Sequence, residues 1–313
     1  MLTPSTVFYT RLRVPENRIK NLRNEEATRA TIEMEIKNLG DNPAIKEDDP
    51  ILIYYAGHGA EAKAPSGWTS ANKKIQMLVP HDFIPSGSRN SKRGQGVLDV
   101  RLAHLLQDVA EKKSDNITVI LDCCHSASGT RTINQDPTFT VRGIKLPGNY
   151  TIPQDLLHNI PHDKARAIVA AQGCEKTALL SHVLLSACMR GQEARERDGH
   201  GAFTSALLSL LKKNGVHKLT YRDVINSLPN LLAQNPQCEG VHQSRYLFNA
   251  KVTNPQREPH VVVKAVVFEA TTVPRADAML LSAKTTNSAL FVMPWASPAS
   301  KIYLPGVDGD AWI

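Results

Sequence analysis

Residues 97–124 read VLDVRLAHLLQDVAEKKSDNITVILDCC, and this stretch decides the fold class. Up to residue 113 its apolar residues recur at the three- and four-residue spacings of an amphipathic helix. The run from 117 to 121 is apolar or β-branched throughout, which predicts a strand buried on both faces. Residues 51–55, ILIYY, form a similar run earlier in the chain. The order strand, helix, strand predicts a parallel sheet in an α/β fold.

The rest of the chain divides by pattern into a main domain and a smaller C-terminal part. Further helices are predicted at 24–40, 202–214 and 219–232. Residues 126–165 are rich in Ser, Thr, Pro, Asn and Asp without periodicity, which predicts a long loop. From about residue 259 the pattern turns β-like, with many Pro and Gly. We therefore expect a main domain at 1–252 and a small β-rich C-terminal region at 253–313.

The composition is that of a globular protein. Of 313 residues, 42% are hydrophobic and 21% are charged, which suffices for a sizeable core. The net charge is +7, but Lys and Arg are dispersed along the chain, so we expect no nucleic-acid binding. No apolar run has the roughly eighteen residues that span a bilayer, so we expect no membrane insertion. The five cysteines form no CxxC pair, which favours a reduced, cytoplasmic protein.

Two reactive side chains follow the two predicted buried strands. His58 comes after 51–55, and Cys124 comes after 117–121. Ligands of open parallel sheets bind at the carboxyl ends of the strands, so both residues lie where a site is expected. A thiol needs a neighbouring imidazole to take its proton and to protonate the leaving group. A single His or buried Cys is more often structural, but their joint placement favours a catalytic pair.

The residues around this pair carry a family resemblance. YAGHG at 55–59 and DCCHSAS at 122–128 resemble the two catalytic signatures of the caspase–metacaspase family, in the same order. The stretches 182–196 and 199–211 resemble a later strand and helix start of that family. Because the animal-caspase QACxG signature is absent, the resemblance is to the metacaspase branch, with fungal sequences the most similar. It spans about residues 15–252.

The resemblance implies a fold and a reaction. The fold is a caspase-like three-layer α/β sandwich with a mostly parallel central sheet. The activity is that of a cysteine-type endopeptidase acting on proteins and peptides, in programmed cell death or proteolytic signalling. Cys124 is the implied nucleophile and His58 the acid–base. The backbone N–H groups of Gly59 and Cys124 are the implied oxyanion donors. Cys123 is the rival thiol, but neighbouring strand residues face opposite sides, and the family motif places the nucleophile directly before His-Ser.

Specificity for the residue before the cleaved bond (P1) is left open by two charged residues. The resemblance implies that Asp122 lines a pocket for a basic P1 side chain, Arg or Lys; a strand-end cap is the alternative. Arg190 stands where the family pattern has an acid, and a cation there would repel such substrates; Glu193 or Glu196 is the alternative source of that acid. We expect a P1 preference that is basic but weakened. A Cys–His hydrolase with another P1 preference remains a further alternative.

The start of the chain departs from the family. The family has an inner hydrophobic strand and a helix before the stretch matched by 13–22, and the sequence predicts that this N-terminal strand is missing. Loss of an inner strand leaves two neighbours with unpaired ladders. Either the fold is unstable, or a partner chain or self-association supplies the strand. A catalytically impaired caspase-like scaffold that binds other proteins is therefore the alternative function.

No cofactor or metal site is predicted. The sequence contains no GxxxxGK phosphate loop and no EF-hand pattern. By analogy, calcium activation occurs among metacaspases and would need clustered carboxylates, for which Asp48, Asp49 and Asp82 are candidates. The resemblance also implies that the loop 126–165 is a linker that is cut during activation.

Overall fold

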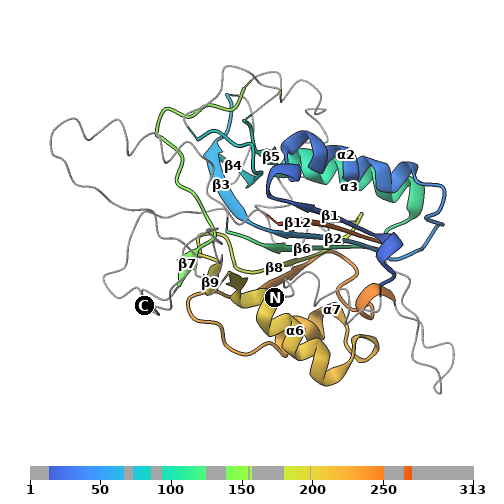
Figure 1. The fold of residues 1–313 in the computed structure, drawn as a ribbon. Helices are drawn as coiled ribbons and strands as arrows, with labels where there is room; N and C mark the ends of the chain where they lie inside the picture. The colour runs from blue at the N-terminus through green and yellow to red at the C-terminus, as the bar shows by residue number, and fades with distance from the viewer. Residues whose placement is uncertain are drawn as a thin grey trace, which may run out of the picture. The chain divides into compact units, whose positions relative to one another are not determined.

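The computed structural model describes residues 14–66, 73–85, 94–124, 139–153, 156, 180–197, 199–249 and 264–269. Its main sheet has six strands in the order β1-β12-β2-β6-β8-β11 (Figure 1). In that order they are Ile19–Arg23, Lys264–Glu269, Ile51–Ala56, Ile117–Asp122, Val183–Ser186 and Gln237–Glu239. All neighbouring pairs are parallel except β11, which is antiparallel to β8. The predicted α/β class with a mostly parallel sheet is confirmed.

Helices cover both faces of this sheet (Figure 1). On one face lie α2 (Arg29–Asp41) and α3 (Asp99–Lys113); on the other lie α6 (Ala202–Asn214) and α7 (Tyr221–Asn226). Short 3-10 turns occur at Glu16–Arg18, Asn24–Glu26, Val216–Lys218 and Leu247–Asn249. Helix α7 is shorter than predicted because it ends before Pro229, which cannot continue a helix. The helices have no span long and apolar enough to cross a membrane in the described part of the chain.

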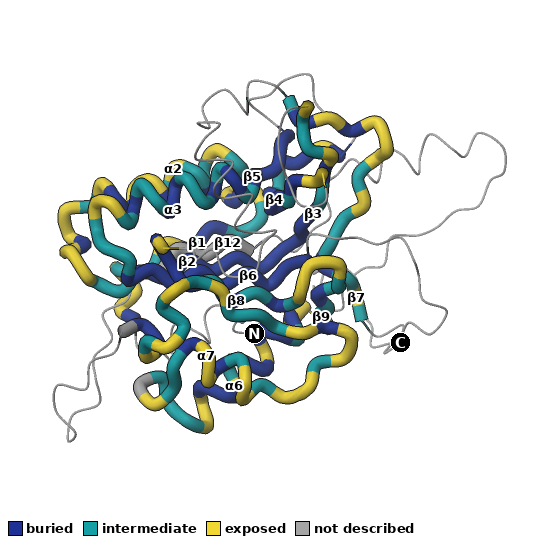
Figure 2. Tube along the Cα trace, turned by 180° about the vertical axis from the view of Figure 1, so that it is seen from behind, coloured by how far each residue is buried: buried dark blue, intermediate teal, exposed yellow. Residues whose placement is uncertain are grey.

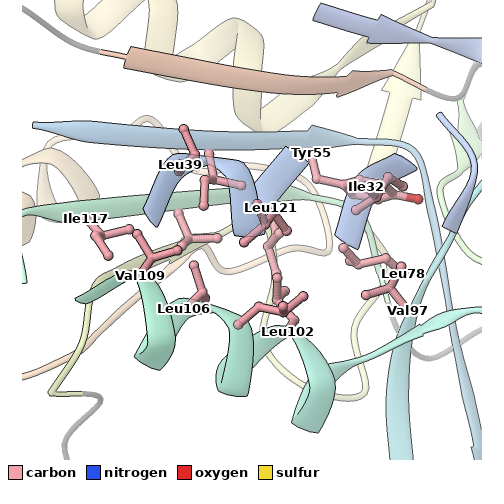
Figure 3. Close-up of a cluster of buried hydrophobic side chains, with 14 of the residues drawn as sticks. Ile32, Leu39, Tyr55, Leu78, Val97, Leu102, Leu106, Val109, Ile117 and Leu121 are labelled. Atoms are coloured by element: carbon pink, nitrogen blue, oxygen red, sulfur yellow. The ribbon is translucent and has the colours of Figure 1, made fainter. Parts of the chain in front are cut away.

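Each helical layer buries one face of the sheet (Figure 2). On the α2/α3 side, the apolar stripe of α3 packs against β6, with Leu102, Leu106 and Val109 facing Ile117 and Leu121 (Figure 3). A second core on the opposite side joins β2 and β6 to α6 and α7. Strands β2 and β6 are buried along their whole length, as the continuous apolar runs predict.

An inner position of the sheet is filled from far along the chain. Strand β12 lies between β1 and β2 and is parallel to both. The sequence predicts that an inner strand is missing and that a separate region begins at residue 253. In the structure, residues 264–269 complete the main sheet, so this sheet extends beyond residue 252.

Two smaller sheets lie near the carboxyl ends of β2 and β6. The first joins β3 (His58–Lys63), β4 (Lys74–Val79) and β5 (Val97–Leu98). The second joins β7 (Thr140–Val141), β9 (Arg195–Arg197) and β10 (His200–Gly201). Most of the predicted loop 126–165 lies outside the described residues. Its longest described stretch, 139–153, contains β7 and therefore includes strand pairing that its composition does not predict.

Candidate active site

The strand register brings the two predicted reactive residues to the same edge. Ala56 at the end of β2 and Asp122 at the end of β6 are directly paired on adjacent parallel strands. His58 follows Ala56 by two residues, and Cys124 follows Asp122 by two residues. Both residues are buried, with 8% of His58 and none of Cys124 exposed. The sheet thus places the imidazole-bearing turn beside the thiol-bearing turn.

A tight turn sets the position of His58. Only Gly57 separates the end of β2 from the start of β3 at His58. A side chain at residue 57 would bring its Cβ to 2.8 Å from the Tyr55 hydroxyl oxygen, so the turn requires glycine. That hydroxyl lies 2.8 Å from the carbonyl oxygens of both His58 and Val79 and can donate to one at a time. Tyr55 therefore ties the His58 turn to β4.

The two neighbouring cysteines lie on opposite faces of the sheet. Cys124 belongs to the core on the α6/α7 side, whereas Cys123 belongs to the core on the α2/α3 side. Burial raises the pKa of the Cys124 thiol to about 11, and burial raises the pKa of Cys123 well above its ordinary value. Both groups are therefore thiols near neutral pH in this state, and only Cys124 shares the face of the Asp122 carboxylate.

The carbonyl oxygen of Arg142 is the acceptor of two converging backbone N–H groups. It accepts a backbone hydrogen bond from Cys124 at 3.0 Å and another from Gly59 at 3.2 Å. These are the two N–H groups that the family resemblance implies as oxyanion donors. Donors that converge on one carbonyl oxygen stabilise the negative charge that develops there during acyl transfer.

The chain around Arg142 is held as an extended strand on both sides. The Arg142 N–H donates to Ala194 at 2.9 Å, and the Ile144 N–H donates to Gly59 at 2.9 Å. Residues 140 and 141 form β7, which is antiparallel to β9. Addition of an extended segment to a strand edge is a recurring mode of peptide recognition. Residues 140–144 are thus hydrogen-bonded to the chain next to Gly59 and Ala194.

The Arg142 side chain enters a buried acidic pocket. Its Nε donates to a Glu196 carboxylate oxygen at 2.9 Å, and its guanidinium lies 3.6 Å from Asp122 Oδ2. It also donates to the carbonyl oxygen of Asp122 at 3.1 Å. Burial lowers the pKa of Arg142, but the negative charges of Asp122 and Glu196 outweigh burial, so its pKa is raised overall. The pocket thus holds a guanidinium beside two carboxylates.

The chain packs closely around Asp122, none of which is exposed. The hydroxyl and the N–H of Thr204 both donate to Asp122 Oδ2, the N–H at 3.3 Å. A Cβ at Gly201 would overlap the Asp122 carboxylate, so only glycine lets this backbone approach. Oδ1 has no hydrogen-bond partner within the described part of the chain. Asp122 thus accepts hydrogen bonds from Thr204 and lies beside the Arg142 guanidinium.

Arg190 lies outside this pocket. Its Nε is 3.5 Å from a Glu61 carboxylate oxygen on β3, and Lys74 contacts the same carboxylate at 2.9 Å. Arg190 and Cys123 also line a cavity of about 140 Å³ on the α3 side of the sheet. The described contacts of Arg190 thus include a carboxylate partner. They do not support the repulsion that the sequence predicts between Arg190 and a basic P1 side chain.

Sequence patterns did not identify the whole pocket. Arg142 lies in a segment without periodicity, and Glu196 is only one of two alternatives for the acid that Arg190 replaces; the fold brings Arg142 and Glu196 together. Gly201 and Thr204 belong to the stretch 199–211 that already resembles the family, and this could have indicated their place beside Asp122.

No metal site is formed by the residues described here. Nowhere in these ranges do three or more His, Cys, Asp or Glu side chains gather so that they could hold an ion. Two of the calcium candidates accept backbone hydrogen bonds: Asp49 accepts the N–H of Lys46 at 2.8 Å, and Asp82 accepts the N–H of Arg29 at 2.9 Å.

Comparison with known proteins places the chain in one family. A model of the caspase domain family matches residues 12–251. Metacaspase-5 of Trypanosoma brucei brucei is 28% identical over 166 residues, which cover 53% of this chain and 30% of that protein. Metacaspase-3 of Trypanosoma cruzi is 34% identical over 83 residues, which cover 26% of this chain and 20% of that protein. The chain thus spans less than a third of either relative.

A solved structure of protein GSU0716 from Geobacter sulfurreducens is also similar. Its TM-score is 0.43 at 21% sequence identity, over 69% of this chain and 74% of that chain. The family match covers well over half of the present sequence and includes His58, Gly59, Asp122 and Cys124. The chain belongs to the caspase domain family, a family of cysteine peptidases.

Proposed function

We propose that the protein is a cysteine-type endopeptidase that cleaves after arginine, with Cys124 as nucleophile and His58 as acid–base. The observation that carries this proposal is the Arg142 carbonyl oxygen between the N–H groups of Cys124 and Gly59. The Arg142 side chain supports it further, because the pocket that it fills contains the carboxylates of Asp122 and Glu196.

The chemistry proceeds by acyl transfer. His58 takes the proton of the Cys124 thiol, and the sulfur attacks the carbonyl carbon of the P1 residue. The oxygen becomes negative and is held by the N–H groups of Cys124 and Gly59. His58 then protonates the departing amine, leaving a thioester. Water, deprotonated by His58, attacks the thioester; the thiolate leaves and regains its proton from His58.

The first substrate that we propose is the chain itself. With Arg142 as P1, the bond presented to Cys124 is Arg142–Gly143, inside the predicted linker. Before this bond is cut, residues 140–144 fill the oxyanion position and the pocket, and burial keeps Cys124 protonated. We therefore expect the uncut chain to be weakly active toward added peptides.

A second candidate is a scaffold without peptidase activity. The feature that favours it is the same filled site, because a segment that is never cut would block substrates permanently. Programmed cell death or proteolytic signalling in the cytoplasm is proposed from the family alone. Calcium activation is likewise proposed from the family alone.

Intact mass spectrometry of the purified full chain separates the two candidates. The peptidase proposal expects fragments ending at Arg142 and starting at Gly143. Cys124→Ala and His58→Ala should remove them, with a loss of at least about a thousandfold in rate. Cys123→Ala is the matched control and should cut within a few-fold of the parent chain. A parent chain that stays whole and does not react with a peptidyl-arginine chloromethyl ketone would support the scaffold.

A further inference from the structure

We propose that β12 is a complementing strand: insertion of residues 264–269 between β1 and β2 holds the His58 turn in place and so makes the peptidase competent. The part of this inference that concerns peptidase activity rests on the proposed function. The part that concerns insertion of β12 into the sheet is independent of the proposed function.

Strand β12 lies outside the part of the chain that resembles the family. The caspase domain match ends at residue 251, yet the central sheet is completed by residues 264–269. The strand forms register pairs with β2 from Lys264–Ile51 to Glu269–Ala56, and with β1 from Ala265–Ile19 to Glu269–Arg23. A segment beyond the matched domain thus supplies one of its inner strands.

An empty slot at this position would be unfavourable. Neighbouring strands are about 4.8 Å apart, so β1 and β2 would be about 10 Å apart without β12 and could not pair directly. Each would carry a row of unpaired N–H and C=O groups next to a buried core that contains Leu22, Ile53 and Tyr55. Among the described strands, β1 joins the sheet only through β12. The position of β1 therefore depends on the inserted strand.

The inserted strand also reaches the catalytic end of β2. Its last residue, Glu269, pairs with Ala56, which is two residues before His58. Ala56 pairs on its other side with Asp122 of β6. Strand β6, which leads to Cys124, is held by β2 and β8 and does not touch β12 in the strand order. Loss of β12 should therefore disturb the His58 turn more than the Cys124 turn.

The occupant that we infer is the chain's own segment rather than that of a second copy. Residue 249 and residue 264 are separated by 14 intervening residues, which at about 3.3 Å each could reach about 46 Å. That is more than twice the length of a six-residue strand, about 20 Å. An exchange between two copies is not required to fill the slot.

A disulfide trap in the full chain tests the insertion without relying on activity. Asn21 and Val267 are directly paired on β1 and β12, within the Cα separation that a disulfide tolerates. We expect Asn21→Cys with Val267→Cys to form a disulfide within one chain, found by peptide mapping and by a monomer on a non-reducing gel. Asn21→Cys with Phe268→Cys is the control, because adjacent strand residues face opposite sides. Equal crosslinking in both pairs, no crosslink, or a crosslinked dimer would overturn the intrachain insertion.

A proline variant tests the effect on the site. Val267→Pro removes one ladder N–H of an inner strand. We expect a lower unfolding temperature and at least a tenfold loss of His58-dependent labelling by the peptidyl-arginine probe, both partly restored by a synthetic peptide of residues 260–273. Ala278→Pro, outside β12, should match the parent chain. Unchanged labelling in Val267→Pro, or no rescue by the peptide, would overturn the complementing role. A correct crosslink in a parent chain that never labels would instead refute the peptidase function and leave the insertion standing.

Discussion

The backbone N–H of Cys124 donates a 3.0 Å hydrogen bond to the carbonyl oxygen of Arg142. The two residues are 18 positions apart in the sequence, and the bond joins the proposed nucleophile to the residue that fills the acidic pocket. In the proposed function, a substrate must displace Arg142 or wait until the bond after it is cut. In that proposal, residues 140–144 are a segment that closes the site before cleavage.

A methyl group added at residue 201 should disturb the packing of the backbone there against Asp122. We predict that Gly201→Ala lowers self-cleavage and activity toward arginine peptides at least tenfold, because the new Cβ would overlap the Asp122 carboxylate. Gly148→Ala is the matched control, since a Cβ there meets nothing within 4 Å. Rates with arginine and alanine at P1, measured for both variants, check the prediction. Equal rates for Gly201→Ala and the parent chain would contradict the close packing.

Replacement of Arg190 should leave P1 preference nearly unchanged. The sequence alone favours a gain in arginine preference for Arg190→Asp, but Arg190 pairs with Glu61 in the structure. We expect the ratio of arginine to alanine cleavage to stay within about threefold of the parent value. Asp122→Asn is the comparison and should reduce that ratio by about 30-fold or more, since it removes a buried charge facing the guanidinium. A large gain for Arg190→Asp would mean that Arg190 reaches the pocket.

Alkylation of Cys124 should report whether the linker covers it. In the uncut chain its pKa is about 11, against an ordinary 9, so at pH 8 its thiolate is about a hundredfold scarcer than that of an ordinary thiol. The iodoacetamide rate at Cys124 should rise up to about pH 11. Arg142→Asp places a carboxylate against Asp122 and Glu196 and should release the segment, which moves the profile to lower pH. Peptide mapping measures the rate, and identical profiles would refute linker burial as the cause.

The same shift has a consequence for stability at high pH. The pKa of Cys124 is higher in the folded than in the unfolded chain. The stabilisation that the protonated thiol gives the folded state is therefore fully present below pH 9 and is lost as the pH rises towards 11. The midpoint of urea unfolding of the Cys124→Ala chain should therefore fall less between pH 9 and pH 11 than that of the parent.

His182 should make the fold sensitive to acid. It is 3% exposed, and burial lowers its pKa from 6.5 to about 4. The unfolded chain binds this proton below pH 6.5 while the folded chain does not, so stability is fully present above pH 6.5 and is lost towards pH 4. At pH 4.5 the free energy of unfolding should be lower by about 2–3 kcal/mol because of this one group. Urea unfolding at pH 7 and pH 4.5 should show a smaller fall for His182→Gln, and an equal fall in both chains would contradict this assignment.

The sequence by itself determined the elements that depend on local pattern. Continuous apolar runs predict β2 and β6, and the three- and four-residue spacing predicts α3 and α6, because burial of one face selects the period of the chain. The positions of His58 and Cys124 at two strand ends follow from the same runs. The opposite facing of Cys123 and Cys124 follows from the two-residue period of a strand.

Tertiary structure alone decided which distant segments meet. The pocket joins Asp122, Arg142 and Glu196, and the sheet joins residues 19–23, 264–269 and 51–56. Local pattern predicts some of these strands but not their order in the sheet or the ion pairs of the pocket, because both kinds of contact join residues far apart in the chain. The sequence likewise places Arg190 at a motif position, but only the fold shows that its charge faces Glu61. A motif sets the residue type at a position, whereas the partner that neutralises it depends on three-dimensional packing.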